Sequence, residues 1–297
     1  MPTHTRFRWV TAFIESRVQS PGLGVLLHAN VTAFPRYMLV LGALCLAVEI
    51  PAPARAQEAA QAAPPATSAR VTYRVEPLAA GELPTKFSPA QLSVLEKLNR
   101  RDLVHLARLT EIIVPDVWLE EELPYSPLPA EWPWAVSMPK ALIVHQPAQV
   151  FGAYEYGRLV RWGPVSTGRK ETPTPAGSYH LTWKSKSRRS TDNDAWLLKW
   201  YFNFINSRGV SFHEFDLPGA AASHACVRLL TRDAMWIYDW GEQWVLTSDG
   251  RSVVTPGTPV VVQGEVDFKN ATPWTSPAWW SQRLTLFAGR PEETVRW

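Results

Sequence analysis

Short runs of apolar and β-branched residues dominate the chain from Ala141 onward. They lie at 141–144, 149–155, 158–166, 177–184, 201–205, 210–213 and 259–262. Such runs between turn-forming residues are typical of β-strands. Tyr156 and Gly157 separate the second and third runs, so we expect these two to form a hairpin. The pattern predicts a mostly antiparallel β domain.

Two other parts of the chain show helical periodicity. Between Ser88 and Leu109, leucines recur at a spacing that predicts two short amphipathic helices, broken around 99–101. A further helix is predicted at 232–239, with Thr231 as the cap of its first turn. We therefore expect a mainly β domain with one packed helix, preceded by a small helical region.

The beginning of the chain has the parts of a secretory signal peptide. An apolar run at 39–48 follows Arg36 and precedes Ala-Arg-Ala at 54–56, which has small residues at the two positions that a cleavage site requires. The run is too short to cross a bilayer comfortably, which favours a cleaved signal over an anchor. We predict a signal at 1–56, with Met38 as an alternative start, and export to the periplasm or cell envelope.

Shifts in composition suggest the remaining boundaries. Residues 57–82 begin with an Ala-, Pro- and Gln-rich stretch, which predicts a linker. The predicted short helices fall within 83–135 and the β-rich runs within 138–264. Residues 265–297 form a C-terminal tail rich in tryptophan, with Trp274, Trp279, Trp280 and Trp297.

Composition and charge limit the kinds of molecule that this protein is expected to bind. The 297 residues are 46% hydrophobic and 19% charged, which is typical of a globular protein. The formal net charge is +3 and the basic residues are scattered, so we expect no nucleic-acid partner. The 15 tryptophans are expected mainly in packing rather than in a sugar-binding platform.

Cysteine usage directs attention to one residue. Cys45 lies in the predicted signal, so the predicted mature chain keeps Cys226. A cysteine nucleophile needs a nearby imidazole or cation to form the thiolate. His224 lies two positions before Cys226, Arg228 two positions after it, and His213 thirteen positions before it. In an extended segment, residues two apart share a face, so His224, Cys226 and Arg228 are expected to lie together.

A metal site is the main alternative for the same residues. His213, Glu214, Asp216 and His224 carry side chains that ligate zinc. The chain has no His-Glu-x-x-His pair, and strands would separate these side chains. We therefore predict neither a metal nor another cofactor.

Two ordered motifs resemble a known family. His213 followed by Ser-His-Ala-Cys-Val-Arg at 223–228 resembles the signature of the L,D-transpeptidases of YkuD type, a His and then Ser-His-Gly-Cys-Ile/Val-Arg. Upstream, 168–169 and 172–179 resemble the Gly and the Thr-Pro-x-Gly-x-Phe/Tyr segment of that family. Two departures are Ala225 in place of Gly and a shorter interval before the Cys, and neither removes a chemical group.

The resemblance implies a β-sandwich-like catalytic domain and assigns roles to the matching residues. Cys226 would attack a carbonyl, and His213 would take the thiol proton and return it to the leaving amine. Arg228 would stabilise the thiolate or bind a substrate carboxylate. Three further residues are expected to shape the loop before Cys226, where the oxyanion and the substrate would bind. They are Ser223, His224 and Ala225. His224 remains the second candidate for the base.

The implied reaction is transpeptidation on peptidoglycan. The enzyme would form a thioester with a tetrapeptide stem, release D-alanine, and pass the acyl group to an amine of a second stem or of an anchored wall protein. Water as the acceptor would make it an L,D-carboxypeptidase. A sortase-like transpeptidase and a non-catalytic peptidoglycan-binding protein with a decayed site remain as alternatives.

Residues 83–135 admit two interpretations. From Leu95 to Pro115 the sequence resembles a LysM-type wall-binding module. A helical cap on the catalytic domain fits the same pattern, and the sequence does not decide between the two.

Overall fold

The computed structural model describes residues 71–191, 193–269 and 272–288, which all belong to one compact unit, Pro64–Trp297. The predicted signal at 1–56 lies outside the described residues. Within the described ranges, no helix combines the length and the apolar character that a membrane span requires.

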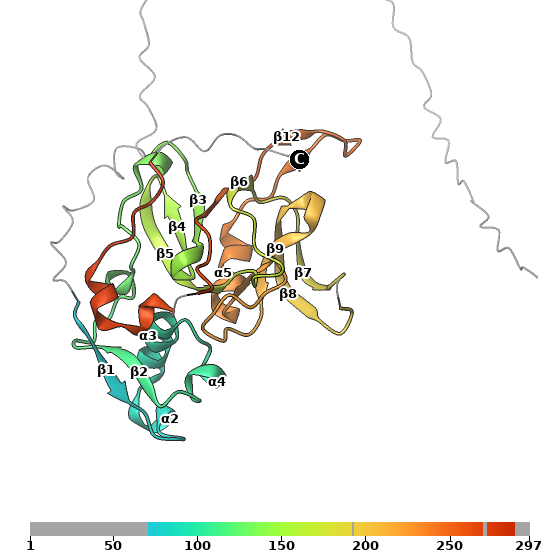
Figure 1. Ribbon diagram of the computed structural model, residues 1–297. Helices are drawn as coiled ribbons and strands as arrows, with labels where there is room; N and C mark the ends of the chain where they lie inside the picture. Colours follow the sequence, from blue (N-terminus) through green and yellow to red (C-terminus); the bar gives the residue numbers. More distant parts are fainter. Residues whose placement is uncertain (1–70, 192, 270–271, 289–297) are drawn as a thin grey trace, which may run out of the picture. The chain divides into compact units, whose positions relative to one another are not determined.

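A curled, mixed sheet of nine strands, the main sheet, organises the described part of the chain (Figure 1). Its strand order is β6-β13-β3-β4-β5-β10-β9-β8-β7, and the pairs β13–β3 and β10–β9 are parallel. The strands are β3 (Ala141–His145), β4 (Val150–Glu155), β5 (Arg158–Ser166), β6 (Gly177–His180), β7 (Lys184–Arg189), β8 (Leu197–Ile205), β9 (Val210–Glu214), β10 (Val227–Leu229) and β13 (Pro259–Gln263). The predicted mainly β fold is confirmed.

The predicted hairpin is confirmed as β4 and β5, which pair in antiparallel register. Its turn residues, Tyr156 and Gly157, have φ values of 47° and 77°. Two positive values are required by the two-residue turn whose twist matches the flanking strands. A small hairpin, β11 (Val245–Leu246) with β12 (Val253–Thr255), lies outside the main sheet.

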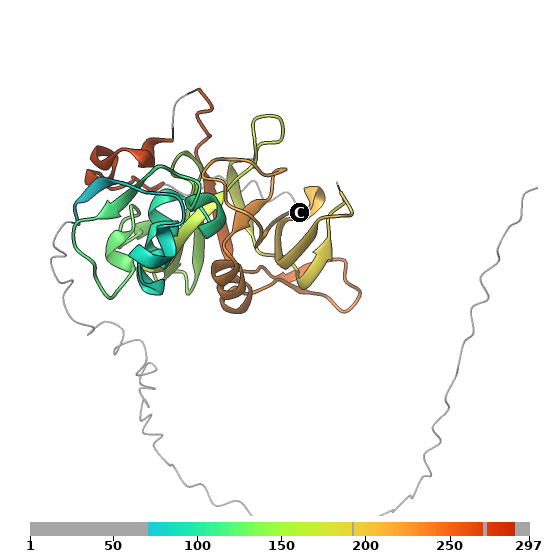
Figure 2. The same cartoon turned by 90° about the horizontal axis from the view of Figure 1, so that it is seen from below.

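Both faces of the central strands of the main sheet, such as β3 and β4, are buried, which explains their continuous apolar runs. On β3, Leu142 and Val144 pack on one face, whereas Ala141 and Ile143 pack on the other. Helix α5 (Thr231–Trp240) contacts β8 and β9 (Figure 2). The helix begins at Thr231, and Leu230 holds the cap position with no side-chain hydrogen bond, so the predicted Thr231 cap is wrong.

An N-terminal module, Tyr73 to Pro115, precedes the main sheet. It consists of β1 (Tyr73–Pro77), α2 (Leu83–Lys86), α3 (Pro89–Asn99), α4 (Leu103–Leu106) and β2 (Glu111–Pro115). Helices α3 and α4 match the two helices expected from the leucine spacing. The antiparallel pair β1–β2 adds a small sheet, and β1 lies within 57–82, where the sequence predicted a linker.

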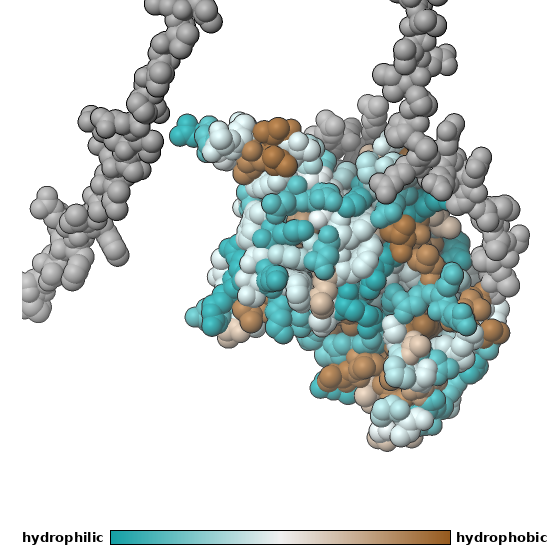
Figure 3. Space-filling view, turned by 180° about the vertical axis from the view of Figure 1, so that it is seen from behind, coloured by the Kyte–Doolittle hydropathy of each residue, from teal (hydrophilic) through white to brown (hydrophobic). Residues whose placement is uncertain are grey.

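The C-terminal tail packs against the N-terminal module. Short helices η5 (Pro273–Thr275) and η6 (Pro277–Ser281) bury Trp274 and Trp280, and they contact α3 and β1. The other short 3-10 helices are η1 (Leu123–Tyr125), η2 (Pro133–Ala135), η3 (Gln146–Ala148) and η4 (Asn206–Arg208). On the face seen in Figure 3, hydrophilic residues surround separate apolar patches, as on most water-exposed surfaces.

Candidate active site

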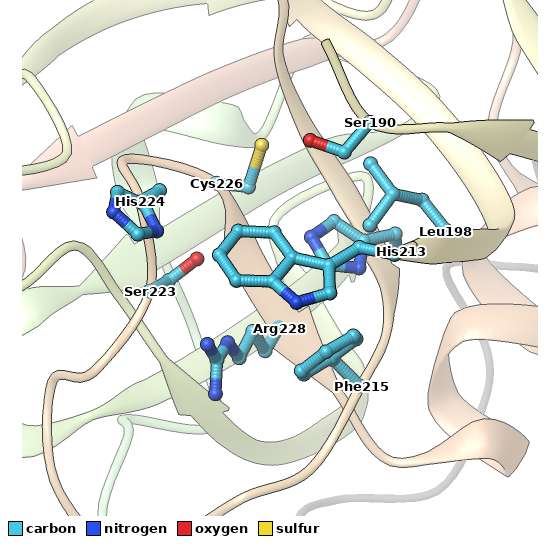
Figure 4. A pocket seen from close by; sticks show the side chains of 9 residues that line it. Ser190, Leu198, His213, Phe215, Ser223, His224, Cys226 and Arg228 are labelled. Carbon is cyan, nitrogen blue, oxygen red and sulfur yellow. The ribbon is translucent and has the colours of Figure 1, made fainter. Parts of the chain in front are cut away.

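The parallel pair β9–β10 places the predicted site residues side by side. Arg228 of β10 is opposite His213 of β9, and it is also opposite Ser166 of β5. Cys226 lies two positions before Arg228, directly ahead of β10, so it shares the same face. The structure therefore brings Cys226, His213 and Arg228 together in one pocket (Figure 4).

The pocket also contains residues that the sequence did not predict as part of the site. In the described part of the chain its lining is Ser190, Trp196, Leu198, His213, Phe215, Ser223, His224, Cys226 and Arg228. Ser190, Trp196 and Leu198 come from the β7–β8 hairpin, far from the motifs in sequence. The sequence left open whether Trp196 lines the cleft or fills the core, and no local signal identified Ser190 and Leu198. Phe215 follows His213 by two positions, and strand alternation could have identified it.

His213 is held as a neutral imidazole. Its side chain is buried, and its Nδ1 lies 2.9 Å from the backbone oxygen of Glu214. A carbonyl oxygen only accepts, so Nδ1 carries the proton and Nε2 is a lone-pair acceptor. Burial lowers the pKa of His213 to about 4, and the charge of Arg228 acts in the same direction. At neutral pH this residue can accept a proton.

Arg228 is fixed from two sides. Its Nη1 donates to Oδ1 of Asp216 over 2.8 Å, and its guanidinium carbon lies 4.5 Å from the centre of the Phe215 ring. Burial lowers the pKa of Arg228, while Asp216 and Cys226 oppose this shift. An arginine keeps its proton at neutral pH, so a cation lines the pocket beside the thiol.

His224 has a different partner. Its Nε2 lies 2.6 Å from Nη2 of Arg169, and its ring packs 5.2 Å from that of Trp196. Arginine only donates, so Nε2 of His224 accepts, and the proton of the neutral ring resides on Nδ1. With this bond in place, neither ring nitrogen of His224 can take the thiol proton.

Ala225 adopts a backbone conformation that favours glycine, the residue at this place in the signature that the motif resembles. Its φ is 70°, which costs a residue with a Cβ atom roughly 1 kcal/mol or more. Its carbonyl oxygen accepts from Oγ1 of Thr174 over 2.8 Å, and the same Oγ1 accepts from the N–H of Gly168 over 2.8 Å. These contacts hold the strained residue in place.

The upstream motif thus supports the loop that carries the cysteine. Ser223 donates its N–H to the oxygen of Thr167, and its own oxygen accepts from the N–H of Arg169, both over 2.9 Å. A Cβ atom on Gly168 would lie 2.2 Å from the oxygen of Thr172, so only glycine fits there. The two motifs, which contact each other through residues more than 50 positions apart, form one structural unit.

Comparison with known proteins identifies the domain to which this site belongs. Residues 139–262 match the family model of the L,D-transpeptidase catalytic domain, YkuD. No curated protein matches the chain.

Solved structures similar to this chain include three L,D-transpeptidases. The one from Stackebrandtia nassauensis is 22% identical, and the match covers 44% of this chain and 58% of that chain, with a TM-score of 0.36. Those from Mycobacterium smegmatis and Mycobacterium tuberculosis are 20% and 25% identical, each with 42% of this chain covered and a TM-score of 0.34. The matches cover 59% and 58% of those two chains, so this chain spans less than two thirds of the length of each.

Proposed function

We propose that this chain, whose residues 139–262 form a YkuD-type L,D-transpeptidase catalytic domain, is a cysteine transpeptidase that acts on peptidoglycan stem peptides. The observation that carries the proposal is the meeting of Cys226, His213 and Arg228 in one pocket on one face of the β9–β10 pair. Their chemistry supplies a nucleophile, a neutral base and a cation.

In the first half of the proposed reaction, Nε2 of His213 takes the thiol proton of Cys226. The thiolate attacks the carbonyl carbon of the stem, and an S–C bond forms. Backbone N–H groups of the loop 224–226 stabilise the oxyanion. The C–N bond to the terminal D-alanine then breaks, and its amine leaves with the proton from His213. A thioester remains on Cys226.

In the second half, an amine attacks the thioester and gives its proton to His213. The new C–N bond forms as the S–C bond breaks, and the thiol regains its proton. An amine of a second stem gives a 3-3 cross-link, an amine of a wall protein gives anchoring, and water gives carboxypeptidase activity. We propose the stem amine as the main acceptor.

Arg228 has two roles in this proposal. Its positive charge stabilises the thiolate, and its guanidinium plane can bind the carboxylate of the departing D-alanine. Asp216 holds one of its nitrogens over 2.8 Å, which fixes the orientation of the plane. The substrate lies in the cell envelope, so we also propose that the protein is exported there.

The N-terminal module is proposed to cap the catalytic domain. Asp102 exchanges two backbone-directed hydrogen bonds with Leu217, which lies in the loop between His213 and Cys226. Wall binding by the same module is the second candidate for residues 83–135. Cosedimentation of the full chain with insoluble peptidoglycan, compared between wild type and variants of the exposed module surface, distinguishes the two.

The proposed activity is tested on the full chain with Cys45→Ala, in which Cys226 is the one remaining cysteine. Incubation with disaccharide-tetrapeptides should give an acyl-enzyme and released D-alanine by mass spectrometry, and Cys226→Ala should give neither. Formation of dimers, of protein adducts or of tripeptides then ranks the acceptors. An inert protein would favour the non-catalytic alternative, and acylation only by a sorting peptide would favour the sortase-like one.

A further inference from the structure

A serine hydroxyl lies beside the thiol on the neighbouring strand. Strands β9 and β10 are parallel, with His213 opposite Arg228. The same register, continued two positions back along both strands, places Ser211 opposite Cys226. Because side chains alternate along a strand, both point to the face that carries His213 and Arg228. Oγ of Ser211 lies 3.5 Å from Sγ of Cys226.

Ser211 is fully buried, and Asn203 of β8, which is also buried, lies opposite it. The Tyr201 hydroxyl donates to the oxygen of Gly209 over 3.1 Å and accepts from Nδ2 of Asn203 over 3.0 Å. The carboxamide oxygen of Asn203 in turn accepts from Oγ1 of Thr182 over 2.8 Å. Neutral hydrogen-bonding groups therefore occupy the strand next to Ser211.

The sulfur of Cys226 lies within hydrogen-bond distance of the Ser211 hydroxyl and can accept its proton. Once the thiol has lost its proton, the sulfur is an anion, and charged acceptors form the stronger hydrogen bonds. Formation of the thiolate therefore directs the Ser211 proton toward the sulfur.

The thiolate also needs a stabilising partner. An ordinary thiol has a pKa of about 8.5, whereas burial holds the pKa of His213 at about 4. Proton transfer from Cys226 to His213 is therefore uphill unless the thiolate is stabilised. Arg228 contributes, but Asp216 neutralises part of its charge. A neutral hydroxyl donor adds stabilisation at a smaller desolvation cost than a second buried cation.

From this geometry we infer that Ser211 is a further catalytic residue, whose hydroxyl donates a hydrogen bond to the Cys226 thiolate. In this step the proton of Cys226 moves to Nε2 of His213, and Ser211 keeps its own proton. The inference rests on the proposed function in that Cys226 is the nucleophile. The acidity of the thiol is nevertheless measurable without any peptidoglycan.

The test measures the pKa of Cys226 from the pH dependence of its alkylation by iodoacetamide. The full chain carries Cys45→Ala, so that one thiol reacts. A hydrogen bond to a charged group that contributes the usual amount corresponds to about one pKa unit. Ser211→Ala should therefore raise the thiol pKa by about one unit. At a pH below both pKa values, alkylation should be about tenfold slower, while its alkaline limit stays unchanged.

Ser178→Ala is the matched control. Ser178 is on β6 of the same main sheet, outside the pocket, and its buried hydroxyl has no hydrogen-bond partner within the described residues. This variant should keep the thiol pKa of wild type. Ser211→Thr, which restores a hydroxyl, should bring the pKa back toward wild type, as a hydrogen-bonding role requires and a cavity effect does not.

Three outcomes would overturn the inference. They are an unchanged thiol pKa in Ser211→Ala, an equal shift in Ser178→Ala, and loss of the near-ultraviolet circular dichroism of Ser211→Ala, which would assign the hydroxyl to folding. A raised pKa in Ser211→Ala, together with no D-alanine release by wild type, would keep the Ser211 hydrogen bond and reject the proposed function. The experiments can therefore reject the Ser211 hydrogen bond and the proposed function independently of each other.

Discussion

The two histidines of the site differ because of one hydrogen bond each. His213 donates from Nδ1 to the oxygen of Glu214, which leaves Nε2 as an acceptor on the pocket side. His224 uses Nε2 to accept from Arg169. From the sequence, both histidines are candidates for the base, because both are close to Cys226 along the chain. The hydrogen-bond pattern favours His213.

We expect His213→Ala to abolish acylation of Cys226, because it removes Nε2, the proposed acceptor of the thiol proton. His224→Ala should only weaken acylation, by a few-fold, because it removes the contacts with Trp196 and Arg169 but no proton acceptor. The measurement is the rate of acyl-enzyme formation by mass spectrometry. Equal rates in His213→Ala and wild type would contradict the assignment.

The residues of the site that could be predicted lie close together along the chain. Cys226 and Arg228 are two positions apart, and strand alternation is enough to relate them. His213 could be predicted because it precedes the motif at 223–228, which resembles a family signature. Ser190 and Leu198 enter the pocket only through the β7–β8 hairpin, and no local pattern encodes such a long-range contact.

At the scale of elements, the loop between His213 and Cys226 is braced by the N-terminal module. Asp102 donates its N–H to the oxygen of Leu217 over 3.1 Å, and its Oδ2 accepts from the N–H of Leu217 over 2.7 Å. Arg101 hydrogen-bonds the oxygen of Pro218. These contacts between the module and the loop hold the loop in position.

Asp102→Ala should therefore lower both stability and activity. The loss of the Leu217 bond and of the N-terminal cap of α4 should reduce the free energy of unfolding by about 2 kcal/mol. A looser loop also releases Asp216, the partner of Arg228, so kcat/KM for D-alanine release should fall by several-fold. Urea unfolding and steady-state kinetics measure the two effects.

Asp116→Ala provides the comparison, because Asp116 pairs with Arg74 on the exposed side of the same module. It should leave kcat/KM unchanged. If both variants reduce kcat/KM equally, the loop contact has no specific role.

Most strands that the sequence predicted are runs of apolar residues buried on the main sheet, as β3 and β4 show. β7 was not predicted because its residues are Lys, Ser and Arg, which suit an edge strand protected against further pairing. β10 has only three residues, and one of them is the functional Arg228. The sequence thus failed to predict β7, which lies at an edge of the main sheet, and β10, which carries a residue of the site. In both strands, exposure or function rather than burial determines the side chains.

At the scale of the whole molecule, two buried histidines should make the fold sensitive to acid. Burial lowers the pKa of both His145 and His213 from the usual 6.5 to about 4. Between these pH values the unfolded chain binds protons that the folded chain excludes, so stability falls as pH falls. Each residue contributes on the order of 3 kcal/mol across that window.

Urea unfolding at neutral pH and near pH 5 measures this dependence. His145→Gln should have a smaller loss of unfolding free energy on acidification than wild type, because it removes one of the two titrating groups. A parallel loss in variant and wild type would show that His145 takes no part.

The C-terminal tail connects the N-terminal module to the main sheet around a buried cation. Arg100 is fully buried at the end of α3, and its Nε donates to the oxygen of Ala148 over 2.9 Å, beside β4. Its guanidinium carbon lies 4.9 Å from the Trp280 ring and 5.6 Å from that of Trp274. Removal of these rings would expose the cation and leave a cavity at the junction of three segments.

Trp280→Ala should therefore lower the free energy of unfolding by about 3–5 kcal/mol. The Trp280 ring also packs 4.9 Å from that of Tyr73 on β1, so the loss should affect the module and the main sheet together. Phe268→Ala, at a side chain that is 43% exposed, should cost within about 0.5 kcal/mol. A single cooperative transition at lower urea is expected in Trp280→Ala. Two separate transitions would instead mean that the tail only links units that are stable on their own.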